Sequence, residues 1–171
     1  FVYTFAIDHL GLSPCTPVPN LPVTIETANG VPWSPKEAGK VEQNGELHPL
    51  SWGLARSRNN YSAWIMKQAK QPQAVANFIH NMGIHSYIDP VPALCLGTSE
   101  SNVYEMVSAF STFANEGVYT TPIFVTRIED RQGNLIASFA PRTQDAISEH
   151  TAYTMLTMLE GVIRSGTGGR L

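Results

Sequence analysis

The sequence has few charged residues, and neither sign of charge is in large excess. Asp, Glu, Lys and Arg make up 15% of the 171 residues, and the formal net charge is −3. A chain without a basic surface is not expected to bind nucleic acid. Hydrophobic residues make up 43% of the sequence, which indicates a folded body with a packed core rather than a disordered segment.

Long apolar runs and metal-ligand patterns are also missing. The longest apolar runs are far shorter than the roughly 20 residues that span a bilayer, and no signal peptide is recognisable. We therefore expect a membrane anchor or export signal elsewhere in the parent chain. Cys15 and Cys95 match no metal spacing and the histidines are scattered, so no metal and no cofactor are expected. Two separate buried thiols are favoured over a disulfide.

Apolar periodicity and helix-boundary residues predict an α+β protein in which helices dominate. A β-hairpin is predicted where the apolar runs 123–128 and 135–139 flank the turn residues 130–134, and a short strand is predicted at 23–25. The predicted helices cover residues 2–10, 50–56 (with Pro49 as the first helical residue), 61–70, 72–82, 102–117 and 148–163.

Two of these helices are expected to bury one apolar face each. Asn102 and Glu105 form a capping-box-like start for the first, and Ser148 is the expected N-cap of the second. The two faces repeat at helical spacing: Val103, Met106, Val107, Phe110 and Phe113, then Ala152, Met155, Leu156, Leu159 and Ile163.

Ser57 and Asn59 lie where one predicted helix ends and another begins, and Asn59 or Asn60 is a suitable N-cap for the second helix. In extended backbone, side chains two residues apart project to the same side, whereas in a helix they diverge by about 200°. A hydroxyl that both donates and accepts, beside a carboxamide, suits proton relay and substrate binding. The alternative is that both residues only end and begin helices.

Five stretches, in order along the chain, resemble the transpeptidase domain of class A (bifunctional) penicillin-binding proteins. Each is weak alone, but all five occur in the family's order. Residues 1–4 resemble the helix that follows the nucleophile motif, and 33–36 (Trp-Ser-Pro-Lys) resemble Trp-x-Pro-x-Asn, with Glu37 where Asn is usual. The others are 54–59, similar to Ala-Leu-x-x-Ser-x-Asn; 96–100 with 108–117, similar to the Leu-Gly-Thr helix region; and 161–163 with 166–168, similar to the segment before the Lys-Thr-Gly strand.

Two motifs of this family are absent from the sequence. An acyl-transfer site of this kind needs Ser-x-x-Lys, Ser-x-Asn and Lys-Thr-Gly, and only Ser57-Arg58-Asn59 is present. The resemblance therefore implies that residues 1–171 are a single partial transpeptidase domain, cut from inside a longer chain and inactive alone. It further implies an exposed apolar patch or unpaired strand edge, which we expect to be hidden by self-association or by the rest of the domain.

The resemblance implies a penicillin-recognising, β-lactamase-like fold and a peptidoglycan D,D-transpeptidase on the periplasmic face of the inner membrane. The implied partners are stem peptides that end in D-Ala-D-Ala, and β-lactams. Ser57 is expected to share in proton relay, Asn59 to bind substrate, and Trp33 and Thr167 to line the groove. The alternatives are a core or loop-pinning role for Trp33 and a flexible loop at Thr167. For the whole protein, the alternatives are a D,D-carboxypeptidase, a serine β-lactamase or a non-catalytic binding or scaffold module.

Overall fold

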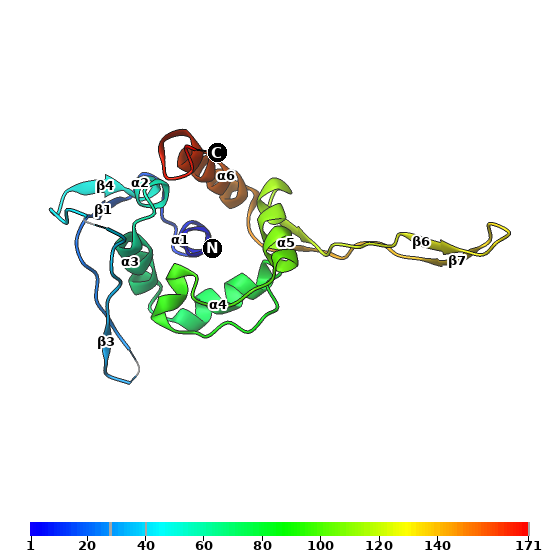
Figure 1. Cartoon of the computed structure of the whole chain (residues 1–171), viewed down its shortest axis with the longest axis horizontal. Helices are drawn as coiled ribbons and strands as arrows, with labels where there is room; N and C mark the ends of the chain where they lie inside the picture. The colour runs from blue at the N-terminus through cyan, green and yellow to red at the C-terminus, as the bar shows by residue number, and fades with distance from the viewer. Residues whose placement is uncertain (28, 40, 171) are drawn as a thin grey trace.

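The molecule is built around one short helix that is buried on nearly all sides. A computed structural model describes residues 1–27, 29–39 and 41–170. Helix α1 (Val2–Asp8) lies at the centre of the body, and other helices surround it (Figure 1). Residues Val2 to Ile7 are all buried, as expected of a helix that is apolar around its circumference. It ends at Asp8, two residues before the predicted end.

Five further α-helices and a 3₁₀ helix form the ring around α1, which packs against α3, α4 and α6. Phe1 also makes an edge-to-face contact with Phe110 of α5, with ring centroids 5.6 Å apart. The elements of the ring are α2 (Leu50–Ala55), α3 (Asn59–Ala69), α4 (Pro72–Asn81), η1 (Pro92–Leu96), α5 (Val103–Ala114) and α6 (Glu149–Ser165).

The strands form four separate antiparallel ribbons, whereas the sequence predicted one hairpin and an isolated strand. The predicted hairpin is confirmed as β6 (Arg127–Glu129) paired with β7 (Leu135–Ser138). The predicted strand at 23–25 is shifted to β2 (Ile25–Glu26), which pairs with β3 (Pro32–Trp33). Strands of two or three residues carry too little alternation to be recognised. The other ribbons are β1 (Pro17–Pro19) with β4 (Leu47–Pro49), and β5 (Val118–Thr120) with β8 (Thr143–Asp145).

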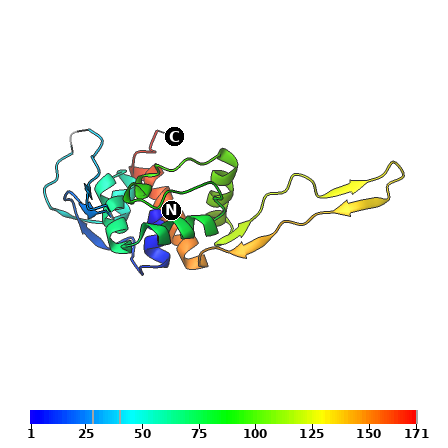
Figure 2. The same ribbon diagram turned by 90° about the horizontal axis from the view of Figure 1, so that it is seen from below.

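Residues 118–145 form an arm that extends away from the helical body (Figures 1 and 2). The arm consists of the β5–β8 ribbon at its base and the β6–β7 ribbon at its tip. Large apolar side chains along it are exposed, among them Phe124 at 86%, Ile136 at 65% and Leu135 at 62%. An exposed apolar surface was expected, and the arm provides one.

The predicted apolar face of α5 is largely wrong. Val103, Val107 and Phe110 are exposed, Met106 is half-buried, and only Phe113 of the five is buried. Polar residues occupy the buried face instead because their hydrogen bonds are made within the protein. The Ser108 hydroxyl donates to the Tyr104 carbonyl (2.8 Å), and the Glu105 carboxylate accepts four hydrogen bonds from residues 85, 86 and 101.

The other predicted boundaries need smaller corrections. In α6, Ala152 and Met155 are buried as expected, but Leu156 and Ile163 are exposed, and the buried face instead includes Thr151 and Met158. Pro49 is the last residue of β4 and precedes α2 rather than beginning it. The two thiols are free and separate, as favoured, but neither is buried as predicted: Cys15 is exposed and Cys95 is half-buried.

Candidate functional site

Ser57 lies in the turn between α2 and α3, and its backbone is left-handed, with φ +53°. The Ser57 amide donates to the Leu54 carbonyl (3.0 Å) and the Arg58 amide to the Gly53 carbonyl (2.9 Å). This is a Schellman ending, in which the position that Ser57 occupies is usually glycine. A side chain costs about 1 kcal/mol there, and such strain is often kept at functional sites.

Arg58 joins the two helices in extended backbone, with φ −81° and ψ 115°. Extended backbone was expected for this turn; Arg58 has it, whereas Ser57 does not. The Arg58 guanidinium lies 5.2 Å from the centre of the Trp52 ring, a cation–π distance. Trp52 stacks on His48, with ring centroids 4.0 Å apart. The turn is therefore supported by a stack of three side chains from β4, α2 and the turn itself.

The predicted N-cap of α3 is wrong. The helix begins at Asn59, and neither Asn59 nor Asn60 caps it with its own side chain. The cap is Glu37, more than twenty residues earlier in the chain. Its carboxylate accepts the Asn60 amide (2.9 Å) and the Asn59 amide (3.3 Å), so a negative charge meets the positive end of the helix dipole.

The side-chain amide of Asn59 is partly occupied within the protein. Its Nδ2 donates to the Lys36 carbonyl at 2.7 Å. A carbonyl can only accept, so this bond fixes the orientation of the Asn59 amide. One N–H and the carbonyl oxygen of Asn59 are not used in this bond, and they are the groups that a substrate would meet.

Thr167 is brought close to the same turn from the other end of the chain. Its backbone amide donates to the Ala55 carbonyl at 3.0 Å, and Ala55 is the last residue of α2. The turn that carries Thr167 also folds back on α6, because the Gly168 amide donates to the Val162 carbonyl (3.1 Å). Residues 166–168 are therefore a docked turn, and the exposed Thr167 side chain lies at the α2 end of the site.

Trp33 lies on a separate element, the β2–β3 ribbon. It is half-buried there, opposite Ile25, and the ribbon is held by a 2.8 Å hydrogen bond between the Thr24 and Ser34 hydroxyls. Its connection to Asn59 runs along the backbone to Lys36 and Glu37. The structure thus brings Ser57, Asn59 and Thr167 to one end of α2, whereas Trp33 lies on the β2–β3 ribbon.

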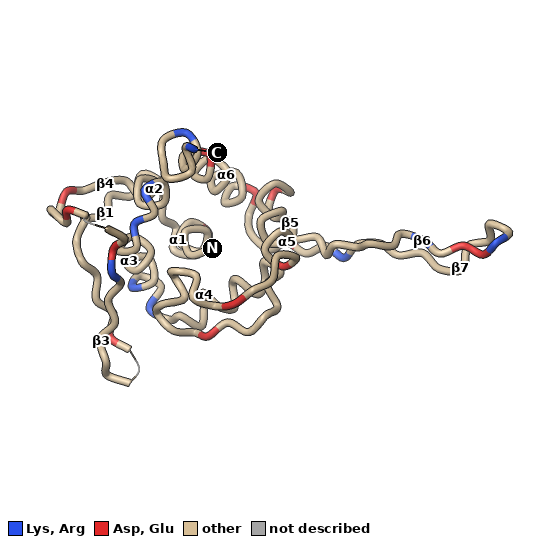
Figure 3. The backbone as a smooth tube through the Cα atoms, in the orientation of Figure 1, with Lys and Arg blue, Asp and Glu red and all other residues tan. Residues whose placement is uncertain are grey.

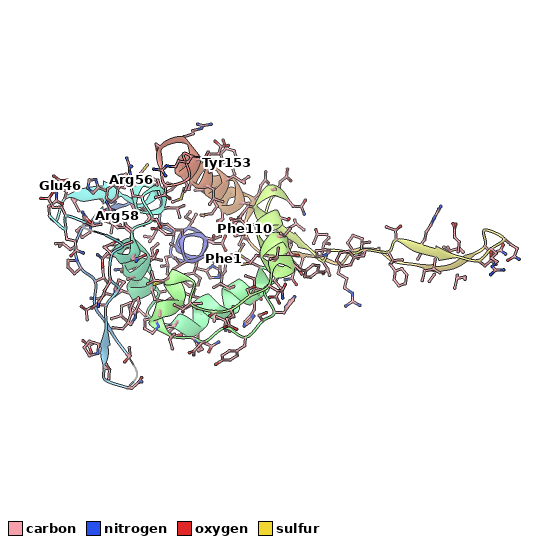
Figure 4. The ribbon with its side chains drawn as sticks, viewed as in Figure 1. Phe1, Glu46, Arg56, Arg58, Phe110 and Tyr153 are labelled. Atoms are coloured by element: carbon pink, nitrogen blue, oxygen red, sulfur yellow. The ribbon has the colours of Figure 1, made fainter. Side chains whose placement is uncertain are left out.

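Two cavities adjoin this region. The smaller, of about 330 Å³, lies at the start of α1 and is lined by Phe1, Leu54 and Ser62 among others. Cys95 also lines it, but burial raises the pKa of this thiol to about 12, so Cys95 is not a thiolate nucleophile at neutral pH. The larger, of about 1040 Å³, lies between the end of α1, α2 and α6. Figure 4 shows Arg56, directly after α2, and Tyr153 on α6, which both line this larger cavity.

Basic residues flank the candidate site. Arg56 and Arg58 stand on either side of Ser57 and are labelled in Figure 4. Figure 3 shows Lys and Arg positions along the tube where α2 meets α3. Among the described residues, no three His, Cys, Asp or Glu side chains are grouped so that they could hold a metal ion. The same residues include no helix that is both long and apolar enough to cross a membrane.

Glu37 and the Arg58–Trp52–His48 stack are the parts of the site that sequence reasoning missed. The only signal for Glu37 was its departure from the Asn of the Trp-x-Pro-x-Asn motif. A cap supplied by a residue 23 positions earlier has no local pattern in the sequence.

The protein has a central apolar helix, a ring of helices and a Ser-x-Asn turn next to a Gly-Thr-Gly turn. This α+β arrangement is the penicillin-recognising fold of penicillin-binding protein transpeptidase domains. In agreement, the structure resembles that of penicillin-binding protein 1A from Haemophilus influenzae, with a TM-score of 0.79 at 20% identity over 98% of this chain and 29% of that one. Penicillin-binding protein 3 from Mycobacterium tuberculosis, solved in complex with aztreonam, gives 0.76 at 17% identity over 98% and 41%.

Sequence comparison finds similarity to the same group of proteins. Residues 93–170 match the penicillin binding protein transpeptidase domain. The chain is 29% identical over 175 residues to penicillin-binding protein 1A of Neisseria meningitidis serogroup A, which covers 98% of this chain and 21% of that protein. The chain is thus similar to class A penicillin-binding proteins, and part of it matches their transpeptidase domain. It spans about a fifth of the length of this relative.

Proposed function

We propose that residues 1–171 are one part of a peptidoglycan D,D-transpeptidase domain, which cross-links stem peptides ending in D-Ala-D-Ala and is acylated by β-lactams. The observation that carries the proposal is Ser57, a serine in a left-handed position that favours glycine, beside an Asn59 whose amide is held by the Lys36 carbonyl. A strained hydroxyl next to a fixed carboxamide is suited to a reaction and has no evident structural benefit.

The reaction requires a nucleophile that this sequence does not contain. In a serine acyl transfer, a serine oxygen bonds to the peptide carbonyl carbon, the C–N bond to the terminal D-Ala breaks, and the serine proton must reach the leaving amine. The chain has no Ser-x-x-Lys and no Lys-Thr-Gly, so residues outside these 171 must supply them. The isolated segment should therefore be inactive.

We assign Ser57 to the proton relay, because a hydroxyl can accept the proton and pass another to the leaving amine. Asn59 would donate its unused N–H to a carbonyl of the stem peptide. Thr167, on the turn docked against α2, would contact the substrate from the opposite side. Trp33 would line the approach from the β2–β3 ribbon. Arg56 and Arg58 favour a substrate that carries carboxylates.

The setting that fits this function is extracytoplasmic. We place the full-length protein at the periplasmic face, anchored in the inner membrane by a segment outside these residues. Its partners there would be peptidoglycan stem peptides and β-lactams.

The test uses the full-length protein that carries this segment and a fluorescent penicillin. We expect the wild type to be labelled covalently and Ser57→Ala to be acylated about 10²–10⁴-fold more slowly, the usual scale for a lost proton transfer. A loss of less than threefold in a folded variant would refute the role of Ser57. The isolated 171-residue chain should not be labelled. Covalent labelling of it would contradict the claim that the nucleophile lies outside these residues.

Turnover separates the related activities. A transpeptidase should join stem peptides to an acceptor amine, whereas a carboxypeptidase would release D-Ala without joining, and a β-lactamase would release hydrolysed penicillin quickly. A non-catalytic binding module would give no covalent adduct at all. These outcomes are measured on the same full-length protein by mass spectrometry of the peptide and penicillin products.

A further inference from the structure

The loop that carries Lys36 and Glu37 is bound to the first turn of α3 by three hydrogen bonds. The Glu37 carboxylate accepts the amides of Asn59 and Asn60, at 3.3 and 2.9 Å. The Lys36 carbonyl accepts the side chain of Asn59 at 2.7 Å. Two adjacent residues of the loop thus hold both the backbone and the side chain of Asn59.

Glu37 supplies what the local sequence of α3 does not. The first amides of a helix have no partners within it, and the residue at the N-cap, Arg58, makes no side-chain capping bond. A carboxylate offers two acceptor oxygens and a negative charge, so it satisfies two of these amides at once. Glu37 is half-buried at this contact, where both oxygens are directed at α3.

The turn is consequently fixed from both sides. Its first half is held by the Schellman bonds of Ser57 and Arg58 to α2. Its second half has no such bonds to α2 and depends on Glu37. The separation between the Ser57 hydroxyl and the Asn59 amide is therefore set jointly by the end of α2 and by Glu37.

We infer that Glu37 is a positioning residue of the Ser57-x-Asn59 element, which sets the direction of the Asn59 amide toward the substrate. The inference rests on the proposed function, because it concerns the same site. Glu37 itself lies behind the turn and contacts backbone amides, not the reacting atoms. In the Trp-x-Pro-x-Asn pattern this position is Asn, a shorter side chain with one acceptor oxygen, so the two-oxygen cap is a property of this chain.

The test compares Glu37→Ala with a matched loss of a helix cap elsewhere, in the full-length protein. Asn102 caps α5 by accepting the Glu105 amide at 2.9 Å, and α5 lies across α1 from α3 (Figure 1). Both Glu37→Ala and Asn102→Ala should lower the Tm by about 2–4 °C, the usual effect of a lost cap. Only Glu37→Ala should slow acylation by fluorescent penicillin, by about 10–100-fold, because small misplacement of a substrate-binding group has costs up to this size.

The readouts separate positioning from simple stability. Glu37→Gln keeps the shape of the side chain but has one acceptor oxygen, so its acylation rate should lie between those of the wild type and Glu37→Ala. Glu37→Asn should also be acylated faster than Glu37→Ala. These two variants also decide the question if Glu37→Ala does not fold. The inference would be overturned if the Glu37 variants were acylated at the wild-type rate, or if Asn102→Ala slowed acylation as much as Glu37→Ala does. Either result would leave the proposed function intact. Failure of the wild type to be labelled would overturn both.

Discussion

The backbone amide of Thr167 donates to the carbonyl of Ala55 at 3.0 Å, which joins the turn after α6 to the end of α2. The two residues are more than 100 positions apart in the sequence. Ala55 is two residues before Ser57, so this bond determines how close the Gly166-Thr167-Gly168 turn lies to the Ser-x-Asn turn.

Gly166 permits this contact, and we expect Gly166→Ala to break it. A Cβ at position 166 would overlap the carbonyl oxygens of Ala55 and Val162, and both are backbone atoms that cannot rotate away. The variant should lose about 1–3 kcal/mol of unfolding free energy, the usual cost of overpacking, measured by urea unfolding.

Gly161→Ala is the matched control for Gly166→Ala. Gly161 lies on α6, and a Cβ there would meet nothing within 4 Å. Alanine is a better helix former than glycine, so this variant should gain up to about 1 kcal/mol. Equal stability of the two variants would show that the turn is not docked against Ala55.

Ser57→Gly should stabilise the protein while it removes the proposed relay. Glycine adopts the left-handed backbone without strain, so we expect a gain of about 1 kcal/mol in unfolding free energy. Glu116→Gly is the control, because Glu116 also has a positive φ, +54°, at the end of α5. Both variants should raise the Tm, but only Ser57→Gly should slow acylation of the full-length protein. A Ser57→Gly protein that is acylated at the wild-type rate would contradict the proposed role.

Most helix boundaries were predicted correctly from local sequence signals. Pro72 begins α4, and the Asn102 and Ser148 side chains cap α5 and α6 by accepting the Glu105 and Thr151 amides. Each of these signals acts within one helical turn, so it is visible in a short window. The helix break at Ser57 was predicted for the same reason.

The parts that could not be predicted depend on residues far apart in the chain. The cap of α3 comes from Glu37, and the docking of Thr167 depends on Ala55. The prediction for α5 was wrong for a different reason. The helix and its period were predicted correctly, but the face predicted to be buried is largely exposed. Val103 and Val107 are the apolar residues of the pattern, while Glu105 is buried because the segment at residues 85 and 86 supplies its donors.

The arm should make the isolated 171-residue chain self-associate. Phe124, Leu135 and Ile136 are exposed on it, and apolar residues on short, open ribbons favour pairing with another chain. The triple variant Phe124→Ser, Leu135→Ser, Ile136→Ser should shift gel-filtration elution toward the volume expected of the monomer. Arg131→Ser with Gln132→Ser, exposed polar positions at the tip of the same arm, is the control and should leave elution unchanged. A wild-type chain that elutes as a monomer at high concentration would contradict the prediction.

Glu105 should make stability depend on pH in the acidic range. Its carboxylate is buried and accepts hydrogen bonds from the Ser86 hydroxyl (2.6 Å), the Ser101 hydroxyl (3.0 Å) and the amides of His85 and Ser86. Chiefly because of the Ser86 hydroxyl bond, the pKa of Glu105 falls from 4.5 to about 2. A lowered pKa in the folded state means that the unfolded chain binds the proton more tightly. The stabilisation is therefore complete above about pH 4.5 and is lost as the pH falls toward 2.

Glu105→Gln tests this directly, because the amide has nearly the same shape and no charge. The variant should be less stable than the wild type at pH 7, and the two unfolding free energies should converge as the pH falls from 4.5 to 2. Ser111→Ala is the control: Ser111 is an exposed, uncharged residue of α5, and its loss should leave the shape of the pH profile unchanged. Parallel profiles for wild type and Glu105→Gln, measured by urea unfolding at each pH, would show that the Ser86 and Ser101 hydroxyls do not stabilise the charged form of Glu105.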